Sequence, residues 1–299
     1  TAYRRQRQMC IRDSLNAGTL VVGHNTALGG ASSALIAAAN TTLDANTAVS
    51  LNNLVTVAGN LNIRGTAALG LNGVISGAGG LTKNGTADLI LNGNNLYQGD
   101  TLLNAGRLVV GNAGALGQGS LIAAAGTTLD ANTAVNLANA VTLGGTMNIG
   151  GTADLTLSGA INGAGSLVKN GTANLTLSNT NGYLGGTVLN GGTLTLTNAG
   201  AIGTGDLTVG GTATLTGTAP LVLANAVHLN AGLTLAGNNP TTLSGVIDGS
   251  GSLTKTGSGT LTLGAGNSYG GGTVLSAGTL VLGNATASVS YTHLRAHET

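Results

Sequence analysis

The chain is poor in aromatic, cysteine, proline and charged residues. Among 299 residues there is no Trp, no Phe, one Cys and two Pro, and only 6% are charged. Disorder is excluded because 42% of the residues are hydrophobic, enough apolar surface to offset the entropy of ordering. A collagen helix is excluded because Gly, which occurs 53 times, does not occupy every third position. These absences predict a core of small aliphatic side chains in thin layers.

Long apolar runs are also missing. No run reaches the roughly 18 apolar residues that a membrane-spanning helix needs. The Arg-rich start is not followed by the apolar stretch of a signal peptide. The sequence therefore predicts no transmembrane segment of its own, and any export signal or anchor is expected outside it. A body without cysteine is typical of exported proteins that cross a secretion system unfolded.

The two ends differ in composition from the middle. Residues 1–14 hold four Arg and Cys10, and residues 288–299 add further basic residues. Both strings resemble translated adapter sequence, so we interpret them as foreign flanks around a body of residues 15–287. The body has five basic residues, Arg64, Lys83, Arg107, Lys169 and Lys255, and seven acidic ones, Asp44, Asp88, Asp100, Asp130, Asp154, Asp206 and Asp248. Its acidic balance makes nucleic acid a poor partner.

The body repeats itself at an interval of 86 residues, the distance from Lys83 to Lys169 and again to Lys255. Such a fixed interval indicates a repeat architecture rather than one globule. We divide the body into copies at 15–101, 102–187 and 188–273, with a partial copy at 274–287. The signature positions of the three copies, to which we assign a structural role, are Gly79, Lys83 and Tyr97, then Gly165, Lys169 and Tyr183, then Gly251, Lys255 and Tyr269.

A shorter period of about 20 residues separates strand-like segments such as LGL, LIL and LVV. Alternating apolar residues with intervening Asn-Gly turns fit either an antiparallel sandwich of hairpins or a β-solenoid. The 20-residue recurrence favours the solenoid, and small side chains suit a narrow lumen with little room for Phe or Trp. We therefore predict an all-β, right-handed parallel β-helix with roughly 20 residues per coil.

The unit from Gly249 to Leu282 reads G-x-G-S-L-x-K-x-G-x-G-T-L-x-L, then N-x-Y-x-G-G-T and A-G-T-L-x-L. It resembles the autotransporter-associated β-strand repeat, also called the passenger-associated transport repeat, of type V secretion. Asp100 departs from the pattern, where a Gly precedes the Thr in the other copies. The resemblance implies a β-helical passenger carried across the outer membrane by a C-terminal β-barrel translocator. It also implies that the repeats aid secretion or folding and that the protein lies at the bacterial cell surface or is secreted.

The body offers little for catalysis. Its imidazoles are His24 and His228, which we interpret as loop or surface residues rather than catalytic bases. The acids are spread over the copies, and we interpret Asp44, Asp130, Asp88 and Asp154 as solvated outward positions; Asp44 and Asp130 are equivalent. Calcium-binding nonapeptides are missing. We expect no enzyme activity, no catalytic, cofactor-binding or metal-binding residues, and no cofactor.

Two hypotheses concern the signature side chains. Lys83, Lys169 and Lys255 either line one side of the solenoid, where they pair with acids such as Asp88 or bind an anionic ligand, or are simply exposed. We favour simple exposure, which protects the edge from aggregation. The signature tyrosines are expected to cap turns at corners rather than to stack on sugars.

These observations predict a non-catalytic, surface-exposed stalk or adhesin segment of an autotransporter passenger. Its partners would be the translocator and a protein or glycan on a host or neighbouring cell. One alternative is a fragment of a β-helical enzyme that degrades polysaccharide, which would require several carboxylates to converge on one groove. Another is an ice-binding or matrix-forming solenoid, which needs a flat face of regularly spaced Thr such as Thr260, Thr262 and Thr279.

Overall fold

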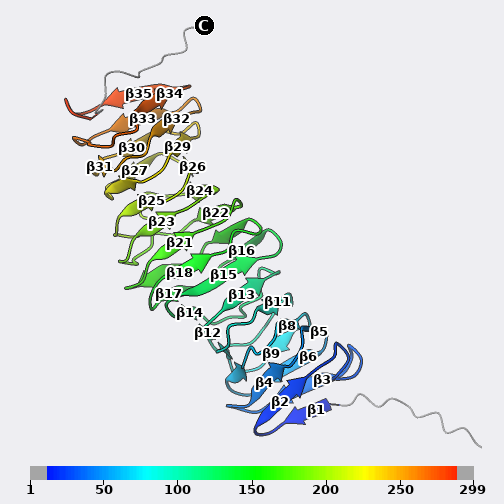
Figure 1. The fold of residues 1–299 in the computed structure, drawn as a ribbon. Coiled ribbons are helices and arrows are strands. Elements are labelled where there is room, and N and C mark those ends of the chain that lie inside the picture. The colour runs from blue at the N-terminus through cyan, green and yellow to red at the C-terminus, as the bar shows by residue number, and fades with distance from the viewer. Residues whose placement is uncertain (1–11, 288–299) are drawn as a thin grey trace, which may run out of the picture. The chain divides into compact units, whose positions relative to one another are not determined.

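A computed structural model describes residues 12–287, which form strands and turns without a helix. They divide into two compact units, one up to Leu121 and one from Ile122, with β14 (Leu121–Ala123) at the division. The division falls inside the second predicted copy. Of the predicted flanks, residues 12–14 belong to β1, and residues 1–11 and 288–299 lie outside the described residues. Figure 1 shows the first unit in blue to cyan and the second in green to red.

The first unit winds through three sheets in turn (Figure 1). The first sheet holds β1 (Arg12–Leu15), β3 (Ala34–Ala37), β6 (Leu54–Val57) and β9 (Ile75–Ser76). The second holds β2 (Thr19–Val22), β4 (Thr42–Ala45), β7 (Leu61–Ile63), β10 (Leu81–Lys83) and β12 (Thr101–Leu103). The third holds β5 (Val49–Leu51), β8 (Leu69–Leu71), β11 (Leu89–Leu91) and β13 (Arg107–Val110).

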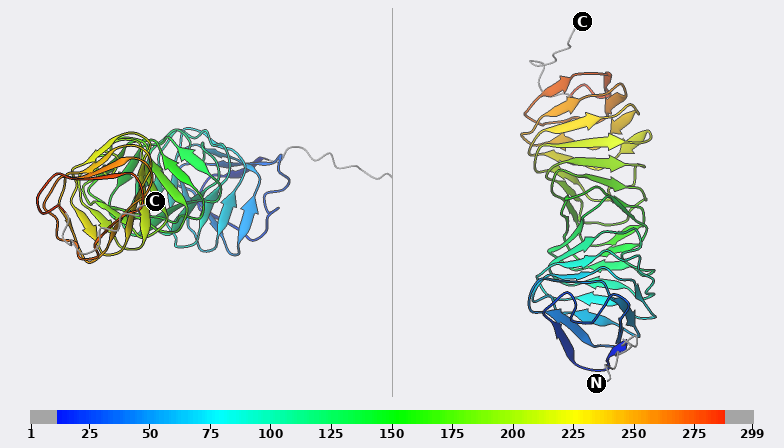
Figure 2. Two further views of the ribbon diagram at one scale, coloured as in Figure 1. Left: turned by 90° about the horizontal axis from the view of Figure 1, so that it is seen from above. Right: turned by 90° about the vertical axis from the view of Figure 1, so that its right-hand side faces the viewer.

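The second unit is built in the same way (Figure 2). One side holds β15 (Thr127–Ala131), β18 (Met147–Ile149), β21 (Leu167–Lys169), β23 (Thr187–Leu189), β25 (Leu207–Val209), β28 (Val227–Leu229) and β31 (Ile247–Asp248). The next holds β16 (Val135–Leu137), β19 (Leu155–Leu157), β22 (Asn174–Leu177), β24 (Thr193–Leu196), β26 (Ala213–Gly217), β29 (Leu233–Ala236), β32 (Leu253–Lys255) and β34 (Thr273–Leu275). The remaining strands are β17 (Val141–Leu143) and β20 (Ile161–Gly163), then β27 (Leu221–Leu223), β30 (Thr241–Leu243), β33 (Thr260–Leu263) and β35 (Thr279–Leu282).

Alternation along each short strand builds the core. Leu89 and Leu91 are fully buried and lie in parallel register with Leu69 and Leu71 of the preceding coil, whereas Ile90 between them is partly exposed. Equivalent leucines therefore stack about 4.8 Å apart, and each contributes about 1.5–3 kcal/mol by burial. The predicted parallel β-solenoid with about 20 residues per coil is confirmed, and the hairpin alternative is wrong because strands pair in parallel with the coils before and after them.

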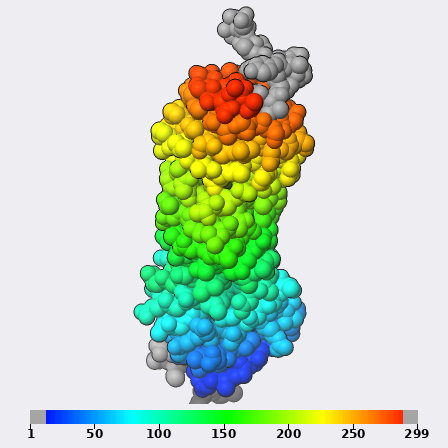
Figure 3. Space-filling view, turned by 90° about the vertical axis from the view of Figure 1, so that its left-hand side faces the viewer, coloured from blue at the N-terminus to red at the C-terminus, as the bar shows by residue number. Residues whose placement is uncertain are grey.

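One side of each unit is interrupted where a tyrosine-containing segment replaces a strand. In the first unit, Leu96 N donates to Ile75 O of the preceding coil and Gln118 N donates to Tyr97 O, so the segment stacks between coils without forming a strand. In the second unit, residues 178–186 and 197–206 do the same between β20 and β27. Figure 3 shows one face of the described residues in space-filling form, with the coils of the second unit following one another from green to red.

Candidate functional site: the polar cluster buried in each repeat

The signature lysines lie inside the solenoid. Lys83 and Lys169 are fully buried, and Lys255 is 3% exposed. Each ammonium donates to backbone carbonyls at the following corner, as Lys169 Nζ does to Asn170 O at 2.8 Å, Gly171 O at 2.9 Å and Gly191 O at 3.3 Å. The prediction that these lysines are exposed is therefore wrong. A buried ammonium is tolerated here because carbonyl oxygens replace its water.

An asparagine in the same repeat joins three successive coils. Asn181 is 4% exposed; its Oδ1 accepts from Ile161 N at 2.8 Å and its Nδ2 donates to Ala201 O at 2.6 Å. Asn95 and Asn267 make the equivalent pairs of bonds in the other two repeats. The asparagine side chain thus satisfies one backbone group of each neighbouring coil, in addition to the backbone hydrogen bonds of the corner segment such as Gly182 N to Ile161 O.

The signature tyrosines are buried beside these asparagines. Tyr97 and Tyr183 are fully buried and Tyr269 is 1% exposed. Each hydroxyl bonds to a threonine hydroxyl four residues later, at 2.5 Å from Tyr97 to Thr101. The rings lie within the corner segments and expose no face for sugar stacking. A lumen with little room for Phe or Trp was predicted; it accommodates a tyrosine ring at each of these points, where a strand gives way to an irregular segment.

The signature glycines are required by close approach between coils. A Cβ on Gly79 would lie 1.9 Å from Gly59 O, and one on Gly165 would lie 2.0 Å from Gly145 O. Both distances are far below van der Waals contact, and the obstructing atoms are backbone. No residue with a side chain fits there without moving the neighbouring coil.

Burial changes the ionisation of the cluster. Desolvation lowers the pKa of Lys83, Lys169 and Lys255, because the charged form loses its hydration. Desolvation also raises the pKa of Tyr97, and that of Tyr183 to about 12, against the opposing hydrogen bond to threonine. Among the described residues, no buried side-chain nitrogen or oxygen lacks a partner. The cluster has no polar atom left over for a ligand.

Successive repeats place this cluster on different sides of the solenoid. In the second unit Lys169 lies on β21 of one sheet, and Lys255 lies on β32 of another. The reason is that 86 residues exceed four coils of about 20 by about one third of a coil, which is one side. The hypothesis that the lysines line one side is therefore wrong as well.

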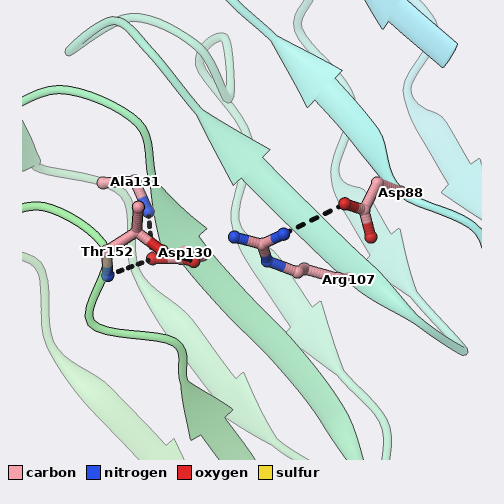
Figure 4. A network of polar contacts seen from close by, with 5 residues as sticks. All are labelled: Asp88, Arg107, Asp130, Ala131 and Thr152. Atoms are coloured by element: carbon pink, nitrogen blue, oxygen red, sulfur yellow. Dashed lines mark hydrogen bonds and ion pairs between the residues drawn. The ribbon is translucent and has the colours of Figure 1, made fainter. Parts of the chain in front are cut away.

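Two aspartates predicted to be solvated are buried. Asp44 is 5% exposed and accepts from Ala45 N, Thr66 N and the Thr66 hydroxyl at 2.9, 3.1 and 2.7 Å. Burial acts to raise the pKa of Asp44, but these hydrogen bonds and the nearby Arg64 hold it below its ordinary value. Asp130, 1% exposed, makes the same contacts in the second unit (Figure 4). Both carboxylates cap the turn of the next coil.

The other acids lie on the outer surface. In the first unit, Arg107 donates to Asp88 at 3.0 Å (Figure 4). In the second unit, His228 lies between two carboxylates, with Nδ1 2.7 Å from Asp248 and Nε2 3.2 Å from Asp206. The hydrogen bonds to Asp248 and then Asp206 raise the pKa of His228. Its surface position agrees with the prediction for histidine, although its two acidic partners were not anticipated.

The described residues contain no group of three or more His, Cys, Asp or Glu side chains that could hold a metal ion. They also contain no helix long and apolar enough to cross a membrane.

Comparison with known proteins identifies the repeats. A family described as "Passenger-associated-transport-repeat" matches three times, at residues 81–110, 167–196 and 253–282. The chain carries three passenger-associated-transport-repeats. Each match begins with the strand that contains the buried lysine and extends through the asparagine, tyrosine and threonine of the polar cluster. No curated protein and no solved structure matches the chain.

The sequence pattern indicated the lysine, tyrosine and glycine of each passenger-associated-transport-repeat, but not the side chains that they contact or adjoin in the cluster. The asparagine and threonine of N-x-Y-x-G-G-T belong to the same cluster, and both are buried in all three repeats; the missed residues are Asn95, Thr101, Asn181, Thr187, Asn267 and Thr273. The spacing of the asparagine could have indicated its burial. Asn and Tyr are two residues apart, and side chains at this spacing face the same way along an extended segment.

Proposed function

We propose that the chain is a non-catalytic stalk segment of an autotransporter passenger, at the bacterial cell surface or secreted, and that its repeats support secretion and folding. The observation that carries the proposal is the polar cluster of each repeat, whose lysine, asparagine and tyrosine bond only to the chain itself. Its atoms are used to hold adjacent coils in register rather than to meet a ligand.

A device of this kind suits a chain that folds after crossing a membrane. A parallel solenoid folds by adding coils to those already formed, and a slip of register would bring each coil to the wrong neighbours. Asn181 and Lys169 each bond to groups about 20 residues away, so their bonds form only when the next coil is correctly placed. We infer that each repeat sets the register of the coils around it.

The test uses the full-length passenger with its translocator. A triple variant, Asn267→Ala, Lys255→Met and Tyr269→Phe, removes the polar cluster of one repeat, and Thr254→Val on the outer face of β32 is the matched control. Surface antibody binding should show less passenger for the triple variant, and what arrives should be sensitive to protease, whereas the control should match the unmodified protein. Equal display and equal protease resistance of both variants would reject the role in folding.

We also propose that the segment contributes to adhesion and that it has no catalytic activity. A polysaccharide-degrading enzyme would bring acids together on one groove. Around His228 the structure brings together two exposed carboxylates, both bonded to the imidazole. We expect no release of reducing sugar from neutral or acidic polysaccharides, and release that is lost in His228→Asn would favour the enzyme.

A further inference from the structure

Arg64 is an exposed cation in the first unit, and the N–H donors of its side chain are unused by the described residues. The three signature lysines are buried against carbonyls, and Arg107 is paired with Asp88. Arg64 follows β7 and is exposed; its backbone N donates to Leu43 O at 3.1 Å, but its guanidinium has no hydrogen bond or ion pair within the described part of the chain. Its guanidinium presents five N–H donors in a planar fork that suits a carboxylate or another oxyanion.

The side chains around Arg64 are polar and uncharged. They line a hollow of about 180 Å³ on the outer face of the second sheet, formed by Thr19, Thr42, Asn62, Arg64 and Asn84. Thr19, Thr42 and Asn62 are register partners on β2, β4 and β7, so they stand about 4.8 Å apart. The hollow is smaller than the 300–1,000 Å³ of sites for drug-sized ligands, and therefore fits a single charged ring or group.

Hydrogen bonds leave donors facing this hollow. Asn84 Oδ1 accepts from Asn104 Nδ2 at 2.9 Å, which leaves the Asn84 Nδ2 donors uncommitted. The side-chain Nδ2 of Asn62 donates to Thr41 O at 3.3 Å, which leaves the Oδ1 of Asn62 as an acceptor. A ligand with one oxyanion and several hydroxyls matches a guanidinium surrounded by amides and hydroxyls.

The charges beneath the hollow do not cancel this preference. Asp44 lies close enough to interact with Arg64, but its carboxylate is buried and accepts two hydrogen bonds from Thr66 and one from Ala45 N. Lys83 adds a second positive charge on the inner side, because its Nζ lies 3.0 Å from the Cβ position of Gly65. This corner therefore has two cations and one anion.

The second copy has Gly150 at the position equivalent to Arg64 and keeps three of the polar side chains. The equivalents of Thr42, Asn62 and Asn84 are Thr128, Asn148 and Asn170, whereas the equivalent of Thr19 is Arg107. The Asn148 amide donates to Thr127 O at 3.2 Å, as Asn62 does to Thr41 O. The cation at position 64 is thus absent from the equivalent position of the second copy.

We propose that Arg64, with Thr42, Asn62 and Asn84, binds an acidic saccharide through its carboxylate or sulfate group. This site goes beyond the stalk function and does not depend on it, because its side chains lie on the outer face and the polar clusters lie inside.

Calorimetric titration of the protein with four probes tests the proposal: an oligogalacturonate, a heparin-derived oligosaccharide, inorganic phosphate and a neutral cello-oligosaccharide. Arg64→Gln removes the cation, and Arg107→Gln removes an equal charge elsewhere in the same unit. We expect one of the two acidic oligosaccharides to bind more tightly than the neutral one and than phosphate. Arg64→Gln should weaken that binding about tenfold to a hundredfold, the value of one charged hydrogen bond, whereas Arg107→Gln should leave it unchanged.

Three outcomes would overturn the site. The first is that neither acidic oligosaccharide binds at millimolar concentration. The second is that Arg64→Gln binds with the same affinity as the unmodified protein. The third is that Arg64→Gln and Arg107→Gln lose the same amount of affinity. Phosphate that binds as tightly as both oligosaccharides would overturn the assignment to a saccharide. Circular dichroism of both variants should match that of the unmodified protein, because both arginines are outside the core.

Discussion

Replacing Asn181 with Ala should destabilise the coils around the second repeat. The side chain is 4% exposed and makes one hydrogen bond to the coil before it, at Ile161 N, and one to the coil after it, at Ala201 O. In Asn181→Ala both backbone groups lose their partner while they remain buried. Each unsatisfied buried group costs about 1–3 kcal/mol, so the variant should lose about 2–6 kcal/mol.

The assay must report locally, because a solenoid need not unfold in one step. Hydrogen exchange of the Ile161 amide measures the opening of the bond that Asn181 accepts. We expect its protection to fall by at least tenfold in Asn181→Ala, and the urea midpoint measured by circular dichroism to fall with it. Amides of the first unit, such as Leu89, should keep their protection.

Asn179 provides the matched control two residues earlier. It is half-buried and makes one longer hydrogen bond, from Nδ2 to Ser158 O at 3.3 Å. Asn179→Ala should therefore cost about 1 kcal/mol or less, because water can replace the lost donor. If Asn181→Ala costs no more than Asn179→Ala, or leaves Ile161 equally protected, the asparagine does not hold the coils together and the reasoning fails.

Three further predictions concern the same unit. Tyr183→Phe should cost about 1–2 kcal/mol in urea unfolding through the lost hydroxyl pair, and a neutral result would mean that the ring alone matters. Lys169→Met should cost about 3 kcal/mol because carbonyls lose a charged donor, and a more stable variant would show that desolvation of the ammonium dominates. The pKa of His228 is raised on folding, so its pair with Asp248 stabilises the protein below the ordinary pKa and this stabilisation is lost as pH rises through the raised value. The difference in stability between the unmodified protein and His228→Asn should therefore be larger at about pH 5 than at about pH 8, and remain under about 1 kcal/mol; a reversed trend would contradict the pairing.

The coil could be predicted from the sequence because two independent periods agree. Alternation in segments such as 89–91 gives strands with one buried face, and recurrence after about 20 residues brings equal strands together. The short strands leave hairpins as an alternative, because Asn-Gly is the common turn of hairpins as well. Only the register of Leu89 with Leu69 decides the matter.

The buried lysines were mispredicted from a general rule rather than from the local pattern. Lysine is almost never fully buried unless it is paired. Yet Lys83 stands two residues after the buried Leu81, as Lys169 stands after Leu167, and period-two alternation places both on the inner face. The alternation pattern therefore predicts burial of these lysines, whereas their positive charge favoured an exposed position. What the sequence could not show was a corner whose carbonyls replace the water around the ammonium.

Asp44 shows the opposite failure. Alternation from the buried Leu43 places its side chain outside, yet the last three residues of β4, Leu43, Asp44 and Ala45, are all buried. The carboxylate is buried because the next coil presents the Thr66 amide and hydroxyl. That contact joins residues 22 positions apart across a turn, and no local pattern encodes it.

The 86-residue repeat is not a whole number of coils of about 20 residues. This mismatch affects residues on the inner face and residues on the outer face differently. Equivalent positions of successive copies lie on successive sheets. Outward-facing residues that recur every 86 residues therefore do not form a straight row, whereas inward-facing residues meet the same packing environment on every sheet. Repetition therefore benefits residues that contact adjacent coils, such as Lys169 and Asn181, and gives no continuous face to a ligand. Binding on such a chain must arise from substitutions in single copies, of which Arg64, with Gly150 at the equivalent position, is the example in the first unit.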